Sequence, residues 1–525
     1  MTGKLKAWGG KPLHVAAFAL AMGFAAACAL VAFVWFLLYD SDMHFMIATG
    51  REILANGIPY ENVWHMEAGY GLVAQQWLYD VVLALVDPMG PKGFAALVLA
   101  QYAVLAFLAY RLFRRAGAPR GVSVLFLAAA SLFFREYIFS IRPQTITFIL
   151  LLSTAMCLER WAEKDDWLWL LPLPLLTLLE INLHGATWPF HFCIVAAYLV
   201  PLPFPKGQDF AEAKHAICHL KQLGITLAAM VGSLFLNPYG LDGAVYVFRS
   251  YTSGCFDVLH VSEMTNTYVL STAGICIVIG FPLAWLCSRL GTLRTGTLNM
   301  FLGFSLATAM SYRNYMFLVL PFLFIMRDLY RGCGDKVAAV DFRRSLTRST
   351  IPALLALDLC AALMVLGTIG SSEWVDADAG SAPSAYDGVA DFLESENAYD
   401  DRIFTRFEIG SLLEYRGFTN IYMDNRVELY TAKLNGVHDT AFDMSRYAGY
   451  GVTLSQKAVR SPSDYYPVSK DEMEAWLEWC DFDYLCVGAK SDTFLQGYLA
   501  NCPDYEPVYD EPGLMAVYAR TDRAG

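Results

Sequence analysis

The sequence has 525 residues, of which 56% are hydrophobic and only 17% are charged. A soluble fold cannot bury this much apolar surface, so the composition predicts a polytopic, α-helical membrane protein. The formal net charge is -12, and the acidic residues crowd into the last third of the chain, which argues against nucleic acid as a partner.

Eleven apolar stretches are expected to cross the membrane. The first covers about residues 14–38, follows three lysines and is too long for a cleaved signal peptide, so we interpret it as an uncleaved span. A further stretch at 72–87 contains Gln75, Gln76 and Asp80, which favour an interfacial helix over a twelfth span. The other ten spans are expected near residues 92–110, 121–134, 144–158, 167–181, 186–202, 223–236, 267–287, 296–311, 315–326 and 350–370.

Basic residues indicate how these spans are oriented. Cytoplasmic loops are enriched in Lys and Arg, and with eleven spans the loops rich in these residues all fall on the same side as the amino terminus. We therefore expect a multi-pass protein of the cytoplasmic membrane. Its amino terminus would be cytoplasmic and its carboxy-terminal part would lie outside.

Composition changes sharply near residue 371. We predict a multi-span part at 1–370 with a large first external loop at 39–91, a linker at 371–385, and a water-soluble extracytoplasmic α/β domain at 386–525. In this domain, helix-period runs at 389–393, 473–479 and 493–499 alternate with strand candidates at 402–404, 421–423, 484–487, 505–509 and 514–518. An extracellular setting would permit one disulfide among Cys480, Cys486 and Cys502.

Unusual polar residues gather on the expected outer face. Asp40, Asp42 and His44 directly follow the first span, where ionisable groups near lipid are costly unless they have a function. The same topology brings five more groups to this face: Arg135, Glu136 and Arg142; Glu180, Asn182 and His184; Asn237 and Tyr239; Asp257, His260 and Glu263; Arg313 and Asn314. The alternative is a set of solvated loops in which Arg and Glu serve as interfacial anchors.

A carboxylate beside arginines at a membrane surface suits the transfer of a group carried on a lipid phosphate. Guanidinium groups hold phosphate oxygens, while an Asp takes a proton from an acceptor hydroxyl or ligates a divalent cation such as Mg²⁺ or Mn²⁺. A transporter would instead use such charges to bind its substrate or coupling ions. Composition alone does not separate these two classes.

Several motifs resemble the GT-C superfamily of polyprenyl-phosphate-dependent glycosyltransferases, which includes protein O-mannosyltransferases, aminoarabinose transferases and the catalytic subunit of oligosaccharyltransferase. The sequence Asp40-Ser41-Asp42 is similar to the acidic element in the first external loop of that superfamily. A group of bacterial multi-span proteins placed in the superfamily is similar at further stretches: Asp40 through His44 to Gly50, Gln75-Gln76-Trp77-Leu78, Arg142-Pro143-Gln144, Asn182-Leu183-His184-Gly185, Asn237-Pro238-Tyr239-Gly240 and, in the tail, Tyr422-Met423-Asp424-Asn425-Arg426.

The resemblance implies a GT-C-like fold and an inverting enzyme that moves a sugar from a polyprenyl-phosphate donor to a glycan, lipid or protein acceptor at the outer membrane face. It implies that Asp40 or Asp42 is the catalytic carboxylate, with Asp40 favoured, and that either acid would ligate a metal if the reaction needs one. Substrate binding is assigned to His44, Arg135, Arg142, Asn182, His184, Arg313 and Asn314. Gln76 replaces an acid that relatives often carry, and the tail lacks the Trp-Trp-Asp motif of oligosaccharyltransferases.

Each assignment has a structural alternative. Asp42 would cap a helix over 43–54, His44 would be a buried histidine of that helix, and Asn182 and His184 would join helices. Glu180 would pair with an arginine rather than meet substrate, and Asp424 with Arg426 would lock a turn. For the whole protein, the rival functions are a transporter or flippase of envelope lipids or glycans, and a non-catalytic protein of envelope assembly.

Overall fold

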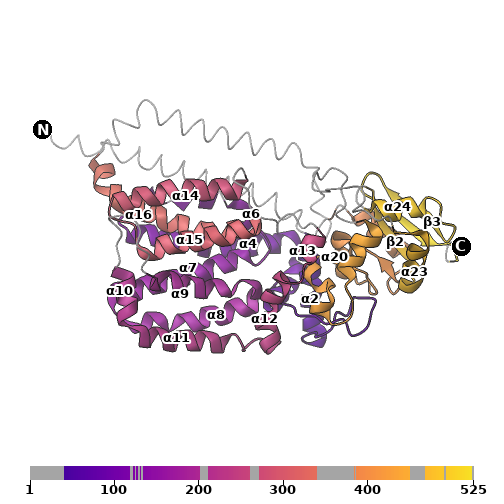
Figure 1. Ribbon diagram of the computed structural model, residues 1–525, viewed down its shortest axis with the longest axis horizontal. Coiled ribbons are helices and arrows are strands. Elements are labelled where there is room, and N and C mark those ends of the chain that lie inside the picture. Colours follow the sequence, from indigo (N-terminus) through magenta and orange to yellow (C-terminus); the bar gives the residue numbers. More distant parts are fainter. Residues whose placement is uncertain are drawn as a thin grey trace, which may run out of the picture. The chain divides into compact units, whose positions relative to one another are not determined.

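The computed structural model describes residues 41–118, 122–123, 126–127, 130–131, 134–200, 211–259, 271–339, 384, 386–449, 468–489 and 492–522. It is mostly helical, with one small sheet near the carboxy terminus (Figure 1). The chain forms two compact units. Unit 1 comprises Met1–Leu38, Pro91–Leu236 and Asn266–Asp378; unit 2 comprises Tyr39–Gly90, Asn237–Thr265 and Ala379–Gly525.

Unit 1 is a bundle of apolar helices. Helix α7 packs against α8 and α9, α9 packs against α15, α15 packs against α14 and α16, and α8 packs against α11; Figure 1 shows these helices side by side. The helices are α4 (Gly90–Arg115), α6 (Arg135–Ile138), α7 (Gln144–Lys164), α8 (Pro172–Leu183), α9 (Pro189–Leu199), α10 (Ala211–Cys218), α11 (Leu220–Ser233), α14 (Thr272–Arg289), α15 (Thr295–Met310) and α16 (Val319–Ala339), with short 3₁₀ turns η2 (Trp167–Leu170), η3 (Gly185–Thr187) and η5 (Tyr312–Leu318).

Proline and glycine set where these helices begin and how closely they approach. Pro172 and Pro189 open α8 and α9, where the missing backbone N–H costs nothing because that donor has no partner within the helix. In α15, a Cβ atom on Gly296 would lie 2.8 Å from the Tyr198 ring, so only glycine lets α9 and α15 pack this closely.

Two helices in the described ranges are long and apolar enough to cross a membrane, Trp77–Arg115 with 39 residues and Gln144–Lys164 with 21. The first of them joins the expected interfacial stretch to the second predicted span. The helices Trp167–Leu183 and Ala273–Arg289 are apolar but shorter. The predicted spans 14–38 and 350–370, and parts of 121–134, 186–202 and 267–287, lie outside the described residues. The number of crossings and their orientation therefore stay predictions.

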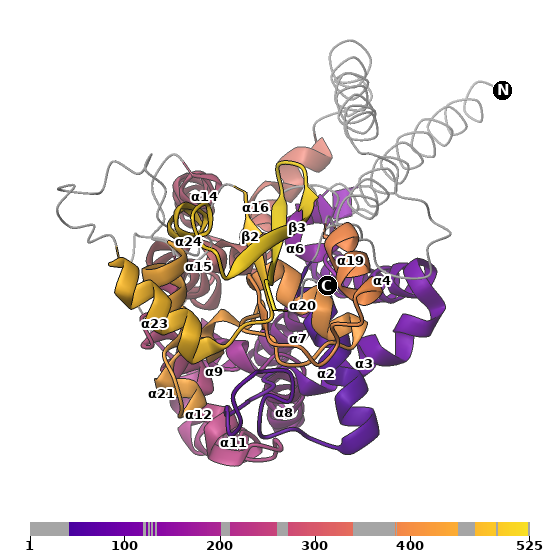
Figure 2. The ribbon, with the colours of Figure 1, turned by 90° about the vertical axis from the view of Figure 1, so that its right-hand side faces the viewer.

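Unit 2 combines helices with a four-stranded sheet (Figure 2). The strands β1 (Ile403–Phe404), β2 (Tyr484–Gly488), β3 (Tyr505–Glu511) and β4 (Met515–Arg520) have the order β1-β2-β4-β3, in which only β1 and β2 are parallel. The helical elements are α2 (Asp42–Asn56), α3 (Trp77–Val86), η1 (Asp87–Met89), α12 (Gly240–Tyr251), α13 (Cys255–Val258), α19 (Asp387–Ser395), α20 (Phe407–Arg416), η7 (Val427–Tyr430), α21 (Ala432–Asn435), α22 (Thr440–Asp443), the π-helix η8 (Met444–Ala448), α23 (Lys470–Cys480) and α24 (Thr493–Leu499).

Most elements predicted for the tail are confirmed. The three helix-period runs form α19, α23 and α24, and four of the five strand candidates form β1 to β4. The prediction of a strand at 421–423 was wrong, because Ile421 makes only isolated bridges, to Ile403 and to His65. The thiols of Cys480, Cys486 and Cys502 are all free, so the structure contains no disulfide among these three residues.

The first loop belongs to the core of the tail. Ile421 N–H donates to Trp64 O (2.8 Å), Met66 N–H donates to Ile421 O (3.3 Å), and Gly71 N–H donates to Asn435 O (2.9 Å). The composition of the sequence instead assigns this loop to the multi-span part at 1–370. Because the loop around residues 61–72 and the tail share one buried core, they lie on the same side of any bilayer.

The Asn237-Pro238-Tyr239-Gly240 motif is also part of unit 2. Asn237 Oδ1 accepts from Tyr239 N–H (2.8 Å), which closes a tight turn before α12, and the Tyr239 hydroxyl donates to Pro59 O (2.9 Å) in the first loop. This contact puts the motif beside that loop.

Candidate functional site

Two predicted arginines of unit 1 lie within electrostatic range of a third predicted site residue, His184. Arg142 stands just before α7, His184 ends α8, and Arg313 lies in η5 directly after α15. The His184 ring is buried and feels the positive charges of both guanidinium groups, which are half-buried. Side chains separated by up to 171 positions, from 142 to 313, therefore form one electropositive neighbourhood.

The local structure at these three chain segments follows from their sequence. Pro143 is the N-cap of α7, and Arg142 N–H donates to Ser140 Oγ (3.1 Å) in the turn before it. Helix α8 ends at His184, whose backbone leaves the helical region (φ -156°, ψ 71°) before the glycine of η3. Ser311 is extended and separates α15 from η5. Each of these three predicted site residues thus lies at a helix end.

A chain of hydrogen bonds sets the proton on His184. Thr147 Oγ1 donates to Glu180 Oε1 (2.7 Å) and lies 2.8 Å from His184 Nδ1. A hydroxyl has one proton and a carboxylate only accepts, so Thr147 must accept from Nδ1–H. Neutral His184 therefore carries its proton on Nδ1, and its Nε2 is the basic nitrogen.

The same carboxylate is held from its other side. Glu180 is completely buried, and it accepts from Thr187 Oγ1 and from His191 Nε2, which lies 3.3 Å from Oε2. His191 Nδ1 in turn lies 2.9 Å from Thr154 Oγ1. The expectation that Glu180 pairs with an arginine was wrong, because these neutral donors and an imidazole surround it.

The sequence did not predict Thr147, Thr187 or His191 as part of this site. A signal was present for His191, an ionisable residue within a predicted span and seven positions after His184, which is two helical turns. The threonines carry no such signal, because buried threonine hydroxyls commonly bond to their own helix backbone.

The remaining predicted residues of unit 1 have structural contacts or lie outside the description. Asn182 Nδ2 donates to Leu178 O (2.8 Å) and Leu236 O (3.3 Å), which joins α8 to the end of α11. Asn314 Nδ2 donates to Ala307 O (3.0 Å) and closes the end of α15. Arg135 begins α6, and its side chain, like those of Glu136 and Asp257, is outside the described residues, as are His260 and Glu263 entirely.

The acidic pair of the first loop is described only at Asp42, since Asp40 lies outside the described residues. Asp42 is the first residue of α2 and not its N-cap, which is Ser41. Its Oδ1 accepts from Asn425 Nδ2 (2.9 Å), which also donates to Ser41 Oγ (2.8 Å). An Mg²⁺ or Mn²⁺ ion at Asp40 and Asp42 therefore stays an expectation from sequence. His44 is buried in α2, with its ring 5.3 Å from that of Tyr415.

Asp424 and Arg426 form a buried ionic cluster. Arg426 donates to Asp424 (Nε to Oδ1, 3.1 Å) and to Glu414, and the Tyr430 hydroxyl donates to Asp424. Burial works against the charge of Asp424, but the adjacent guanidinium lowers its pKa to about 2. Burial raises the pKa of Glu414 well above its usual value, and the charge of Asp424 adds to the effect. The cluster therefore favours an ionised Asp424 paired with Arg426, and the protonated form of Glu414.

Arg426 also ties the tail to the first loop. Its guanidinium carbon lies 5.1 Å from the ring centroid of Trp64 and 5.4 Å from that of Phe45, both in residues 41–76. The interpretation of Asp424 and Arg426 as a structural lock agrees with this geometry.

No protein-family model matches the sequence, and no curated protein matches it. Among solved structures, the crystal structure of the Archaeoglobus fulgidus oligosaccharyltransferase in the apo form is similar over 98% of this chain and 75% of that chain, with 11% sequence identity and a TM-score of 0.46. At this TM-score, the function of the chain has to be argued from its own residues.

Proposed function

We propose that the chain is a membrane glycosyltransferase that moves a sugar from a polyprenyl-phosphate donor to an acceptor at the outer face of the cytoplasmic membrane. The observation that carries the proposal is that Arg142 and Arg313 lie close enough to His184 for their charges to act on its ring. Guanidinium groups remain charged at any physiological pH and match the geometry of phosphate oxygens. Helices long and apolar enough to cross a membrane suit a ligand whose hydrocarbon tail stays in lipid.

His184 would respond to the charge that develops during the reaction. When the bond between the sugar and the phosphate breaks, negative charge grows on the leaving polyprenyl phosphate. Nε2 of the neutral ring has no proton, so His184 would take one up from solvent as this charge grows, and the new Nε2–H would donate to a phosphate oxygen. Nδ1–H meanwhile stays hydrogen-bonded to Thr147, which in turn donates to the Glu180 carboxylate. Donors placed in advance where charge develops are the main source of electrostatic catalysis.

The resemblance at Asp40-Ser41-Asp42 supports a carboxylate of the first loop as the base that activates the acceptor. In the proposed reaction the acceptor hydroxyl oxygen attacks the anomeric carbon, the bond from that carbon to the phosphate oxygen breaks, and the hydroxyl proton passes to Asp40 or Asp42. The electron pair of the broken bond stays on the phosphate. One displacement at the anomeric carbon inverts its configuration. The acceptor class, whether glycan, lipid or protein, is left to experiment.

One observation favours a second candidate, a transporter or flippase of a related lipid. Glu180 and His191 form a completely buried pair between helices, with a threonine beyond the imidazole. Buried chains of carboxylate, histidine and hydroxyl groups are found as proton relays in transporters.

The test uses the purified full chain in lipid nanodiscs with a panel of polyprenyl-phosphate sugars and with glycan, lipid and peptide acceptors. Polyprenyl phosphate release and glycosylated acceptor are both measured by mass spectrometry. We expect release by the wild type and its loss in Asp40→Asn or Asp42→Asn. Arg142→Gln and Arg313→Gln should weaken binding of polyprenyl phosphate, whereas Arg160→Gln at the other end of α7 is the matched control.

The two candidate functions give different results. Full transfer by both acid variants would show that the catalytic carboxylate lies elsewhere. A wild type that uses no donor, yet moves polyprenyl phosphate between the leaflets of a vesicle, would favour transport over transfer.

A further inference from the structure

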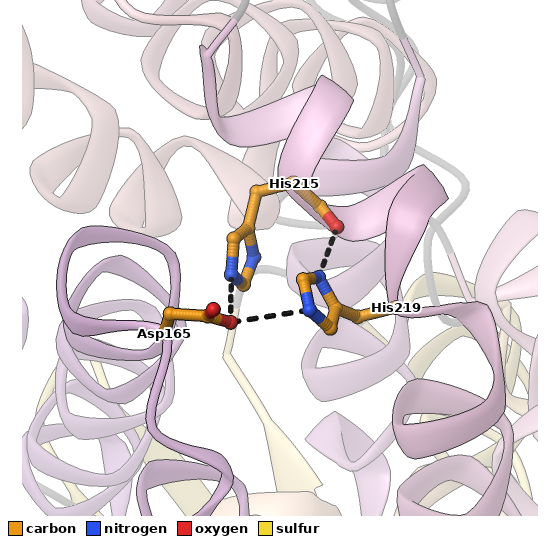
Figure 3. A group of neighbouring side chains, drawn as sticks. All are labelled: Asp165, His215 and His219. Carbon is orange, nitrogen blue, oxygen red and sulfur yellow. Dashed lines mark hydrogen bonds and ion pairs between the residues drawn. The ribbon is translucent and has the colours of Figure 1, made fainter.

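A second group of ionisable side chains lies at the far end of α7 from Arg142. Asp165 ends this helix in the left-handed conformation (φ 52°), His215 belongs to α10, and His219 stands between α10 and α11 (Figure 3). A helix of 21 residues is about 30 Å long, so this group and the Arg142 neighbourhood are separated by about the thickness of a membrane core.

The three side chains direct their ligand atoms at one point. Asp165 Oδ1 lies 2.9 Å from His215 Nε2 and 3.1 Å from His219 Nε2, as the dashed lines in Figure 3 show. All three atoms lie within 4.8 Å of one another. In a tetrahedral zinc site with bonds of about 2.0–2.1 Å, ligand atoms are about 3.3 Å apart. The two distances to the carboxylate oxygen are within a few tenths of an ångström of that spacing.

The hydrogen bonds of His219 call for a cation at this point. His219 Nδ1 lies 2.9 Å from the carbonyl oxygen of His215, which can only accept, so Nδ1 carries a proton. In the neutral ring Nε2 then carries a lone pair and no proton, and it faces a carboxylate oxygen at 3.1 Å. Two acceptors at this distance repel each other unless a proton or a metal ion stands between them. A carbonyl behind the second nitrogen is also the usual support of a metal-binding histidine.

The surroundings hold the imidazoles in place and leave a path for an ion. The buried Trp161 ring meets the His215 ring edge to face at 4.6 Å, and its Nε1 donates to Gln222 (3.1 Å). The two imidazole rings stack at 4.2 Å. The Asp165 side chain is 66% exposed, so water and ions reach the carboxylate directly.

We propose that Asp165, His215 and His219 bind a divalent transition-metal ion, Zn²⁺ foremost, through two Nε2 atoms and one carboxylate oxygen, with a solvent molecule as fourth ligand. Imidazole nitrogen prefers zinc and its neighbours in the periodic table over Mg²⁺ or Ca²⁺, which take oxygen ligands. The ion would fasten the end of α7 to the junction of α10 and α11. Two histidines four positions apart, His215 and His219, are a spacing common in such sites.

The experiment measures Zn²⁺ binding to the full chain, purified without a polyhistidine tag, stripped with a chelator and reconstituted in nanodiscs. Zn²⁺ is titrated in competition with a chromophoric chelator, and Co²⁺ is substituted to read the coordination geometry from its visible absorption. We expect one equivalent of Zn²⁺ and a tetrahedral Co²⁺ spectrum.

The variants assign the ligands. His215→Gln and His219→Gln should abolish stoichiometric binding, and Asp165→Asn should weaken it by at least about tenfold. Asn tolerates the left-handed conformation of position 165, so this last variant keeps the helix end. Asp166→Asn is the control on the adjacent carboxylate, which accepts from Leu168 N–H, and His438→Gln is the control on a histidine paired with a carboxylate in unit 2. Both should bind as the wild type does.

Absence of stoichiometric Zn²⁺ binding by the wild type would overturn the proposal. The positive charge beside Asp165 would then be a proton on His219. Equal binding by the wild type and by all three ligand variants would overturn it as well. Thermal unfolding of each apoprotein shows whether a loss of binding comes from a loss of fold.

Discussion

The hydroxyl of Thr147 lies 2.8 Å from His184 Nδ1 and thereby determines which imidazole nitrogen faces the rest of the site. Thr147→Val keeps the shape of the side chain but leaves Glu180 without one donor and His184 without its acceptor. Leaving buried polar groups unpaired costs about 1–3 kcal/mol of stability. We also expect a loss of transfer activity that exceeds the loss of folded protein.

The control for Thr147→Val is Thr177→Val in α8. Thr177 is equally buried, but its hydroxyl donates to the backbone carbonyl of Leu173 (3.0 Å), which has a helical partner already. Equal activity of the two variants, measured as polyprenyl phosphate release per folded molecule, would argue against a role of Thr147 in orienting His184.

Glu414 should make unit 2 less stable as the pH rises. Burial, with the charge of Asp424, raises the pKa of Glu414 in the folded state above that of the unfolded chain. Between these two pKa values the folded state binds the additional proton, so the free energy of unfolding falls with increasing pH by up to about 1.4 kcal/mol per pH unit. The contribution is fully present below about pH 4.5.

Glu414→Gln keeps the acceptor for Arg426 and cannot ionise. We therefore expect this variant to be more stable than the wild type at pH 8 and to show a flatter dependence between pH 5 and pH 8. Urea unfolding of the full chain, followed by tryptophan fluorescence, measures both quantities. Parallel curves for the two proteins would mean that Glu414 is ionised in the folded state.

His65 should make unit 2 less stable as the pH falls. Its ring is stacked on Tyr70 at 3.7 Å, and its Nδ1 accepts from Glu67 N–H (3.1 Å). Burial lowers the pKa of His65 to about 3, although the nearby charge of Asp424 opposes the shift. The stability linked to the neutral ring is present above about pH 6.5 and is lost as the pH falls toward 3, by about 1.4 kcal/mol per pH unit.

His65→Phe keeps the ring stack and removes the titration. We expect a flatter acid limb of the stability curve between pH 6.5 and pH 4.5, at a lower overall stability because Glu67 N–H loses its acceptor. His438→Gln provides the contrast: the hydrogen bond to Asp443 raises the pKa of His438 above 6.5, so the contribution of His438 changes only above about pH 6.5, and its removal should leave the slope between pH 6.5 and pH 4.5 unchanged. A wild-type curve that is already flat over this range would refute the prediction.

Gly410 marks the closest approach within unit 2. A Cβ atom at this position of α20 would lie 1.8 Å from the carbonyl oxygen of Met423, and a backbone atom cannot move aside. Gly410→Ala should therefore destabilise unit 2 by more than about 3 kcal/mol, as overpacking of a rigid site does at its upper range. Gly224→Ala in α11 meets no atom within 4 Å and should stabilise its helix by up to about 1 kcal/mol. Thermal unfolding compares the two variants directly.

The sequence alone established the local features of this protein. Its apolar composition and the periodicity of its segments predicted α7, α8 and α15, and the strand patterns at 484–487 and 514–518 predicted β2 and β4. These features depend on the hydrophobicity and conformational preference of neighbouring residues, which can be read along the chain. The positions of Arg142, His184 and Arg313 at helix ends followed from the same reading.

Tertiary structure alone decided which side chains meet. Thr147 lies 33 positions before Glu180, and its local sequence resembles that of any helix threonine. Ile421 does not form a strand; its backbone donates a hydrogen bond to, and accepts one from, a loop more than 350 positions earlier. Asp165 and His219 likewise come together only because α7 and α10 pack against each other. Such partnerships depend on the packing of distant elements and on which buried polar groups remain to be satisfied, and neither quantity is a property of a local stretch of sequence.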